Sequence, residues 1–338
     1  MGRLMHQPSR VLVIGAQGVL GNFVACSLRE AGWQVTRGGR RAEGAGDFQL
    51  IDLDRPDRLA EILTGFDLVI STVPHHRLTA ERIILREGGT LINLSTLLSA
   101  DRQLLASETK AARGLVMVHV GIAPGVVTLV AADLLAKHPE ADTVEIAMTL
   151  SASGASGRSG REFAHRLLTD KLYYPTDLIP LSQPFGVRRC LQVDLAKEGW
   201  LSNSSQGRRE HLYICFSETF LHNVLLWLNQ LRLISFLPKA AFVFGRRSIP
   251  LELTTEPICE WVAVARDGKR LAACTIEGRG DYRSTVMAAL VLVSAVKQKS
   301  IPEGSLHGVF GVEELFTLEE LRPDLEAKGI RIKEQELP

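Results

Sequence analysis

Three glycines near the N-terminus have the spacing of a phosphate-binding turn. Gly15, Gly18 and Gly21 form the pattern G-x-x-G-x-x-G directly after the apolar run RVLVI. Glycine permits a tight turn, lets the backbone approach a pyrophosphate, and lets a helix pack closely on a strand. The start of the next helix would offer backbone N–H groups to the phosphates. The pattern predicts a dinucleotide site and excludes a P-loop, because no Gly-Lys-Ser/Thr follows.

The stretch VTRGGRR, residues 35–41, lies where a dinucleotide-binding fold usually ends its second strand on an acid. That acid accepts hydrogen bonds from the ribose 2′-hydroxyl of NAD, whereas the 2′-phosphate of NADP repels an acid and binds arginine. Arg40 and Arg41 lie at the right distance, and Gly38 and Gly39 would leave room beside the adenosine. The pattern predicts NADP(H) as the cofactor, with plain surface charge as the alternative role of both arginines.

A nicotinamide cofactor also needs a group that supplies or takes a proton near the substrate. In open α/β sheets such groups gather beyond the carboxyl ends of the strands. His75 and His76 follow the predicted strand 67–74 and can exchange a proton near neutral pH, so they are the predicted acid/base residues. The alternative for each is a helix cap or a solvent-facing position. They predict no metal site, because adjacent side chains diverge and no third ligand has suitable spacing.

The same rule defines the rest of the predicted site. The cofactor-binding candidates are Gly15, Gln17, Gly18, Val19, Leu20, Gly21, Arg40, Arg41, Asp52, Leu53, Thr72, Val73, Pro74, Ser95 and Gly121. The substrate-binding candidates are Thr96, Ala123, Pro124, Gly125, Arg158 and Arg161. The last two belong to the Gly/Ser-rich stretch 151–162 and could clamp a carboxylate, although the stretch also fits a flexible linker.

Alternating strands and helices must position these residues. Short apolar runs predict strands at 10–14, 33–37, 48–54, 67–74, 90–95 and 115–121, each separated from the next by a turn or a helix. One helix per strand implies right-handed crossovers and a parallel sheet that is covered on both faces. We therefore expect an α/β fold with a Rossmann-type doubly wound parallel sheet.

The second half has a different pattern. It predicts a strand from residue 142, a long apolar helical region over 209–236, a hairpin around Asp267-Gly268, and a helix over 281–298. This mixture indicates an inserted α+β domain, expected as an antiparallel sheet with helices on one side. Apolar residues lie on more than one face of the helix over 221–236, which predicts burial and a homodimer interface.

The order of these motifs resembles that of the saccharopine dehydrogenase-like family of NAD(P)-dependent oxidoreductases. The segments that carry the resemblance are VIGAQGVLG, IDLD, DLVISTVP, LINLS and GLVMVHVGIAPGVVTLVAADLL, followed by EGRGDYRSTVMAALVLVSAV and GVFGVEELFTLEELRPDLEAKGI. The resemblance implies an NADP-binding Rossmann domain over 8–130, to which residues 283–338 return, and a substrate and dimerisation domain over 131–282. It also implies hydride transfer to or from the C=N bond of a small amino-acid- or imine-type metabolite.

Several alternatives remain open. Ala123 stands before the Pro-Gly pair where several amino-acid-handling members have an acid, which argues against saccharopine itself as the substrate. Reduction of a C=C or C=O bond, or NADP sensing without turnover, would keep the same glycines and arginines. A short-chain dehydrogenase is excluded, because none of the four tyrosines has a lysine four residues later.

Composition limits the class of partner. The formal net charge is +1 with both signs interspersed, so we expect neither a nucleic-acid nor a membrane partner but a small-molecule substrate. The five cysteines lack ligand spacing, and the N-terminus lacks an apolar targeting core. Both features predict a cytoplasmic protein with reduced thiols.

Overall fold

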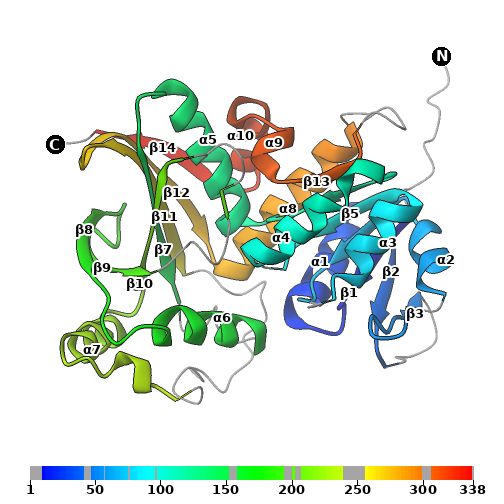
Figure 1. Cartoon of the computed structure of the whole chain (residues 1–338), viewed down its shortest axis with the longest axis horizontal. Coiled ribbons are helices and arrows are strands. Elements are labelled where there is room, and N and C mark those ends of the chain that lie inside the picture. The colour runs from blue at the N-terminus through cyan, green and yellow to red at the C-terminus, as the bar shows by residue number, and fades with distance from the viewer. Residues whose placement is uncertain are drawn as a thin grey trace. The chain divides into compact units, whose positions relative to one another are not determined.

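Figure 1 shows the computed structural model of the chain, which describes residues 10–41, 47–56, 58–74, 77–95, 97–151, 158–193, 200–201, 207–238, 256–298 and 306–336. The chain divides into two units. The first unit comprises Met1–Val120 and Leu292–Gly311, and the second comprises Gly121–Val291 and Val312–Pro338. Among the described residues, no helix is both long and apolar enough to cross a membrane.

The first unit contains a seven-stranded sheet in the order β13-β6-β5-β4-β1-β2-β3. Every neighbouring pair of its strands is parallel. The strands are β1 (Arg10–Ile14), β2 (Gln34–Gly39), β3 (Phe48–Leu50), β4 (Leu68–Ser71), β5 (Gly89–Asn93), β6 (Gly114–Met117) and β13 (Gly308–Phe310). The order reverses between β1 and β4, which is where a doubly wound sheet opens a crevice beyond the carboxyl ends of its strands.

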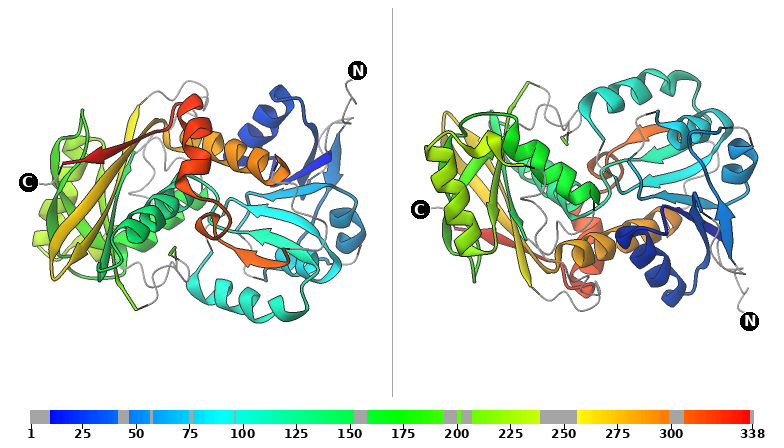
Figure 2. Two further views of the ribbon diagram at one scale, coloured as in Figure 1. Left: turned by 90° about the horizontal axis from the view of Figure 1, so that it is seen from above. Right: turned by 90° about the horizontal axis from the view of Figure 1, so that it is seen from below.

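Helices cover both faces of this sheet (Figure 2), which is why its central strands are apolar along their whole length. The helices are α1 (Val19–Glu30), α2 (Leu59–Thr64), α3 (Thr79–Glu87) and α4 (Ser99–Ser107), with the 3₁₀ turn η1 (Thr109–Ala111). Leu12, Ile51, Leu63, Ile84 and Leu91 are among the buried residues of the core. The expected Rossmann-type sheet is confirmed.

The second unit contains another seven-stranded sheet, in the order β14-β12-β11-β7-β10-β9-β8. Its strands are β7 (Thr143–Leu150), β8 (Thr176–Pro180), β9 (Val187–Val193), β10 (Arg209–Phe216), β11 (Pro257–Arg266), β12 (Lys269–Arg279) and β14 (Arg331–Gln335). The sheet is mixed rather than purely antiparallel, because β7 and β10 run parallel. The hairpin between β11 and β12 turns at Asp267-Gly268 as predicted, with positive φ at both residues.

The segment expected to be one long helical region is partly a strand. Residues 209–216 form β10, which pairs with β7 on one side and with β9 on the other. The last five residues of β10, 212–216, are all apolar and buried, so side chains on both faces of the sheet are covered there and the sequence hides the two-residue period. The helix α7 (Thr219–Gln230) and the 3₁₀ turn η5 (Ile234–Phe236) follow.

The edges of the second sheet meet, so the sheet is strongly curled. Gln335 Nε2 on the edge strand β14 donates to the Pro180 carbonyl oxygen on the opposite edge strand β8, at 2.9 Å. The curled sheet encloses a core that includes Tyr213, Cys215, Trp261 and Phe185.

Helices complete the second unit. They are α5 (Val127–Lys137), α6 (Arg158–Thr169), α7, α8 (Asp281–Gln298), α9 (Val312–Leu315) and α10 (Leu318–Ala327), with a π-type segment η2 (Ile122–Val126) ahead of α5. The division between the units falls inside α8, after Val291. The Lys297 ammonium lies over the Trp33 ring at 4.6 Å, so the last turns of α8 pack on the first unit's own residues.

The C-terminal segment divides differently from the expectation. Residues 283–338 were expected to return to the Rossmann domain as a whole, but Val312–Pro338 belongs to the second unit. The reason is strand pairing: β14 is antiparallel to β12, whereas β13 is parallel to β6. The first boundary also differs, since it lies after Val120 rather than near residue 130.

Candidate functional site

The glycine turn joins β1 to α1 with no space for side chains at two of its positions. Gly15 has a φ of 84°, and a Cβ on it would collide with the side chains of Val73 and Thr72. A Cβ on Gly21 would collide with the Gly15 carbonyl oxygen. Internal packing therefore explains Gly15 and Gly21, which keep the strand, the helix and the residues after β4 close together.

Gly18 is less crowded than Gly15 and Gly21. Its φ is −83°, and a Cβ would meet only the Gly15 carbonyl oxygen among described atoms within 4 Å, at 3.3 Å. A shift of a few tenths of an ångström would relieve that contact. None of the described side chains caps α1, whose first turn begins with Val19, Leu20 and Gly21. Glycine at this position and an uncapped helix start fit a pyrophosphate that approaches the backbone closely.

The end of β2 lies against the glycine turn. The backbone N–H groups of Gly15 and Ala16 donate to the Gly38 carbonyl oxygen at 2.9 and 3.2 Å. Arg37 donates from its guanidinium to the Ala16 carbonyl oxygen at 3.1 Å, a contact that the sequence patterns did not identify. The only sequence feature that could have suggested a role for Arg37 is its position within the stretch VTRGGRR.

Gly38 and Gly39 both lie against other residues of the first unit, and the room that they would leave beside the adenosine stays a prediction. A Cβ on Gly38 would lie 3.2 Å from Ile51 and Leu12 atoms in the core. A Cβ on Gly39 would lie 2.5 Å from the Gln17 side-chain oxygen. Gln17 fills this space and donates from Nε2 to the Arg41 carbonyl oxygen at 2.8 Å, so it fixes the backbone that leads out of β2.

Arg40 and Arg41 follow β2 directly, and both are exposed. They lie one strand away from the glycine turn, because β2 is the parallel neighbour of β1. This is the edge of the sheet at which the adenosine ribose of a dinucleotide is held in such folds. The role of the two arginines in cofactor binding stays a prediction.

Asp52 and Leu53 follow β3. The Asp52 carboxylate accepts from the Asp54 backbone N–H at 3.1 Å and lies 3.8 Å from Arg55, so it holds a local turn. Leu53 is buried in the core beneath this turn.

Thr72, Val73 and Pro74 follow β4 at the switch point. The Thr72 hydroxyl donates to the Ile14 carbonyl oxygen at 3.0 Å, which ties the end of β4 to the end of β1. His75, His76 and Thr96 lie outside the residues that the structure describes. Their predicted roles therefore stay predictions.

Ser95 follows β5 and is held by two residues that sequence reasoning missed. Asn93 Oδ1 accepts from the Ser95 backbone N–H at 2.7 Å and from the Ser95 hydroxyl at 2.5 Å. Asn93 Nδ2 donates to Glu81 Oε1 at 2.6 Å. Burial, followed by the charge of Asp101, raises the pKa of Glu81 to about 7, and the hydrogen bond from Asn93 opposes that shift. The sequence signal for this group was Glu81 itself, a glutamate on the buried side of α3.

The predicted substrate loop, Gly121–Gly125, belongs to the second unit. Gly125 has a φ of 127°, a conformation that favours glycine. Its carbonyl oxygen accepts from the buried Thr128 hydroxyl at 2.9 Å, and that hydroxyl also lies 2.9 Å from Glu313 on α9. Ala123 is half-buried, while Pro124 is buried.

A second polar group lies where α8 begins. Asp281 Oδ2 accepts from the Ser151 backbone N–H and hydroxyl at 3.4 and 3.3 Å. Burial, followed by the charges of Glu218 and Glu256, raises the pKa of Asp281 to about 7. Burial and the charge of Asp281 likewise raise the pKa of Glu260 on β11. A glutamate within the apolar run ICEWVAV was the signal for this group.

The predicted arginine clamp is described only in its backbone. Residues 158–161 begin α6, but the side chains of Arg158 and Arg161 lie outside the described part of the structure. Among the described residues, no group of three or more His, Cys, Asp or Glu side chains is arranged to hold a metal ion.

Comparisons with known proteins agree on the fold. No family model matches the sequence, and no curated protein matches it. Saccharopine dehydrogenase (L-Glu forming) from Saccharomyces cerevisiae is similar in structure, with a TM-score of 0.60, 13% identity, and coverage of 97% of this chain and 100% of that one. Amine dehydrogenase from Mycobacterium smegmatis is also similar, with a TM-score of 0.50, 13% identity, and coverage of 94% and 98%.

The similarity extends over both units of the chain. The protein therefore has a saccharopine dehydrogenase-like fold, a Rossmann-type unit combined with a second α/β unit, as the order of the sequence motifs predicted. At this level of identity the comparison establishes the fold, and the activity has to be argued from the site.

Proposed function

We propose that the protein is an NADP(H)-dependent oxidoreductase that transfers hydride to or from the C=N bond of a small amino-acid- or imine-type metabolite. The observation that carries the proposal is the glycine turn at the switch point of a parallel sheet, in which Gly18 is less crowded than Gly15 and Gly21 and precedes a helix start that no described side chain caps. A bound dinucleotide explains it, because only glycine lets the pyrophosphate reach the backbone at the start of α1.

The second support is the positive charge after β2. Arg40 and Arg41 can bind a 2′-phosphate through charge-assisted hydrogen bonds, which an acid at the same place would repel. No acidic residue follows β2 directly in the sequence. The cofactor would therefore be NADP(H), and it would supply the hydride.

The substrate class is proposed from the fold and from the residues at hand. The two similar structures are named for saccharopine and for amines, and both names indicate chemistry at a C–N bond. Arg158 and Arg161 are the proposed partners of a substrate carboxylate, and Thr96, Pro124 and Gly125 stay candidates for contact with the substrate. Ala123 carries no ionisable group, so proton transfer falls to His75 or His76.

Turnover assays test this proposal directly. NADPH should be oxidised in the presence of imines formed from 2-oxo acids and amines, or of cyclic imines. Replacing the catalytic histidine in His75→Gln or His76→Gln should lower kcat by roughly 10²–10⁴-fold, as loss of a general acid does, while NADPH affinity stays nearly unchanged. Full activity in the double variant would exclude both histidines.

The same assay separates the other candidate activities. Oxidation of NADPH with enones or ketones, but not with imines, would indicate reduction of a C=C or C=O bond. NADPH binding without turnover across the whole panel would indicate a sensing protein.

We also propose a cytoplasmic location and a homodimer. All five cysteines are free thiols, which suits a reducing compartment. The dimer is supported by exposed apolar side chains on α7, where Phe220 and Trp227 are 83% and 58% exposed. Aromatic residues on an exposed helix are typical of subunit interfaces.

A further inference from the structure

A buried relay of hydrogen bonds connects α3 to the residue that follows β5. Glu81 in the first turn of α3 accepts from Asn93 Nδ2 at 2.6 Å. Asn93, the last residue of β5, accepts at Oδ1 from the backbone N–H and the hydroxyl of Ser95. The backbone of Asn93 is also held, because its carbonyl oxygen accepts from the Val120 N–H at 3.4 Å.

The relay is costly to bury, which argues that it does more than fill the core. Glu81 is only 2% exposed, and its Oε2 atom has no hydrogen-bond partner among the described residues. Asp101 on α4 adds negative charge to the surroundings of Glu81 instead of neutralising it. An apolar residue at position 81 would avoid the desolvation of a carboxyl group, whose burial normally requires paired oxygens.

Glu81 and the Ser95 backbone together fix which way round the Asn93 amide lies. The Ser95 N–H can only donate, so the amide oxygen faces Ser95, and the NH₂ end is held by its hydrogen bond to Glu81 Oε1. The Ser95 hydroxyl has one hydrogen, and it is used on Asn93 Oδ1. What remains on Ser95 Oγ is a pair of acceptor sites and no donor.

We propose that Glu81 is a positioning residue, which acts through Asn93 to make the Ser95 hydroxyl a fixed acceptor for a donor group on the cofactor. A ribose hydroxyl or the carboxamide N–H₂ of the nicotinamide half is such a donor. The inference rests on the proposed function, since it needs a dinucleotide at the carboxyl ends of the strands. It adds a residue that lies beneath the site and does not contact the cofactor itself.

A double-mutant cycle tests the proposal, with NADPH dissociation constants measured by titration on the full chain. Ser95→Ala removes the acceptor and should weaken NADPH binding by about 10-fold, the effect of one lost hydrogen bond. Glu81→Leu should weaken it to a similar extent. Because Glu81 acts through Ser95, the double variant Glu81→Leu/Ser95→Ala should bind no more weakly than Ser95→Ala alone.

Two further variants act as controls. Glu81→Gln keeps an acceptor oxygen for Asn93 Nδ2 and should bind NADPH within about 2-fold of the unaltered protein. Glu87→Leu changes an exposed acid on the same helix, and it should have no effect. Thermal unfolding confirms that each variant is folded, and Glu81→Met, which fills the space more flexibly, replaces Glu81→Leu if that variant unfolds.

The outcomes are distinct. If the unaltered protein binds no nicotinamide dinucleotide, the proposed function fails and the role of Glu81 fails with it. If it binds NADPH but Glu81→Leu binds equally well, or the effects of Glu81→Leu and Ser95→Ala add, the role of Glu81 alone is overturned. Loss of affinity in Glu81→Leu, no further loss in the double variant, and retention in Glu81→Gln support it.

Discussion

The charges of single residues decide which nicotinamide cofactor the first unit can hold. Arg40 and Arg41 are exposed after β2, so their replacement should not disturb the core. The variant Arg40→Ala/Arg41→Ala should bind NADPH at least ~10-fold more weakly, because charge-assisted hydrogen bonds contribute about 1.5–3 kcal/mol. NADH affinity should not change, because NADH lacks the 2′-phosphate.

Titration of both cofactors measures this preference. Arg86→Ala is the control, since Arg86 is an exposed arginine of the same unit that pairs with Glu87 on α3. Equal affinities of the unaltered protein for NADH and NADPH would show that the two arginines are plain surface charges.

The half-buried carboxyl group of Asp281 should make stability depend on pH. The pKa of Asp281 is raised from 3.8 to about 7, so the folded state keeps a proton that the unfolded state has lost. The stabilisation is complete below pH 3.8 and is lost as the pH rises to about 7, an effect on the order of 4 kcal/mol. Asp281→Asn stays neutral and should lack this slope.

Denaturant unfolding of both proteins at several pH values between 4 and 8 gives the comparison. Glu260 and Glu81 change stability in the same direction, so the informative quantity is the difference between the unaltered protein and Asp281→Asn. A difference that is constant over this range would contradict the assignment.

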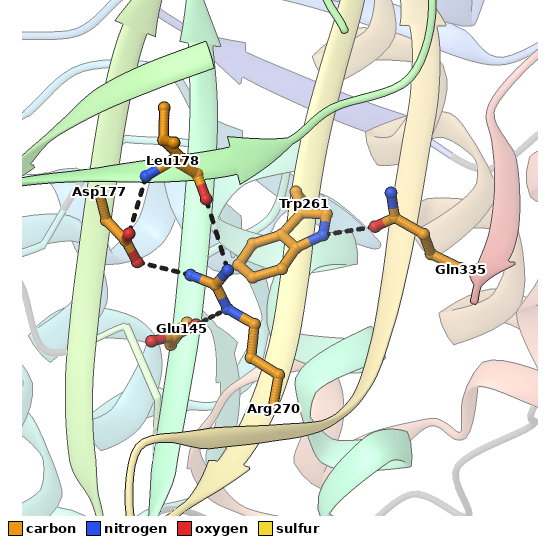
Figure 3. A network of polar contacts seen from close by, with 6 residues as sticks. All are labelled: Glu145, Asp177, Leu178, Trp261, Arg270 and Gln335. Atoms are coloured by element: carbon orange, nitrogen blue, oxygen red, sulfur yellow. Dashed lines mark hydrogen bonds and ion pairs between the residues drawn. The ribbon is translucent and has the colours of Figure 1, made fainter. Parts of the chain in front are cut away.

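Among the elements of the second unit, one arginine joins strands that are far apart in the sheet order. Figure 3 shows Arg270 on β12 with its Nε 2.7 Å from Glu145 on β7 and a terminal nitrogen 2.7 Å from Asp177 on β8. Its guanidinium lies 4.9 Å from the centre of the Trp261 ring, and Trp261 Nε1 donates to Gln335 on β14. The group therefore holds the curled sheet together where its edges meet.

Arg270→Ala should destabilise the protein by about 2–4 kcal/mol, because it leaves the buried Glu145 carboxylate without its partner. The matched control is Arg209→Ala. Arg209 forms a 2.9 Å pair with Asp142 in the same unit, but its side chain is 60% exposed against 24% for Arg270. Exposed pairs contribute about 0–1 kcal/mol. Equal losses of unfolding free energy in the two variants would show that the network does not hold the edges.

Sequence patterns predict a helix or a strand well when the residues of that element alone determine its structure. The run RVLVI forms β1, and the amphipathic segment after the glycine turn forms α1. Both could be predicted because the apolar run of a buried strand and the period of a helix are visible within a few consecutive residues. The segment HLYICF was predicted wrongly as helix. It forms part of β10 because it pairs with β7 and β9, which are distant in the sequence. Its apolar run fits a buried helix equally well.

The candidate site divides in the same way. Gly15, Gly18 and Gly21 could be recognised because their spacing is local, and the structure leaves no space for a side chain at Gly15 or Gly21. Glu81 and Asn93 could not, because their hydrogen bond joins a helix to the strand that follows it, and no spacing rule connects them. Asp281 and Ser151 are separated by 130 residues and meet only in the folded unit.

At the scale of the whole chain, the C-terminal segment shows that the order of sequence motifs does not determine which sheet each strand joins. The resemblance led us to expect one return to the first unit, yet β13 and β14 join different sheets. Both strands are short, and neither sequence indicates which strand it will pair with. β13 pairs with the edge that β6 leaves open, and β14 pairs with the edge that β12 leaves open. Which sheet edges are open to a further strand is determined only by the complete fold, so it cannot be predicted from the sequence of the C-terminal segment.

The same scale decides whether the protein is a dimer. The helical region over 221–236 was expected to be buried, and only part of it is: Leu225 and Asn229 are buried, while Phe220, Trp227 and Phe236 are exposed. The buried face is tied down by Asn229, which exchanges hydrogen bonds with the Tyr174 backbone. The opposite face is left apolar, and a second copy of the chain would cover it.

We expect a homodimer in solution at micromolar concentration. Phe220→Glu/Trp227→Glu introduces like charges at the proposed interface and should convert the dimer to a monomer, because charges are disfavoured in an interface core. Leu50→Glu is the matched control, as Leu50 is an exposed apolar residue of the first unit and should not affect assembly. Light scattering coupled to gel filtration measures the mass of each variant. A monomeric unaltered protein, or a dimer that survives both glutamates, would show that α7 is not a subunit interface.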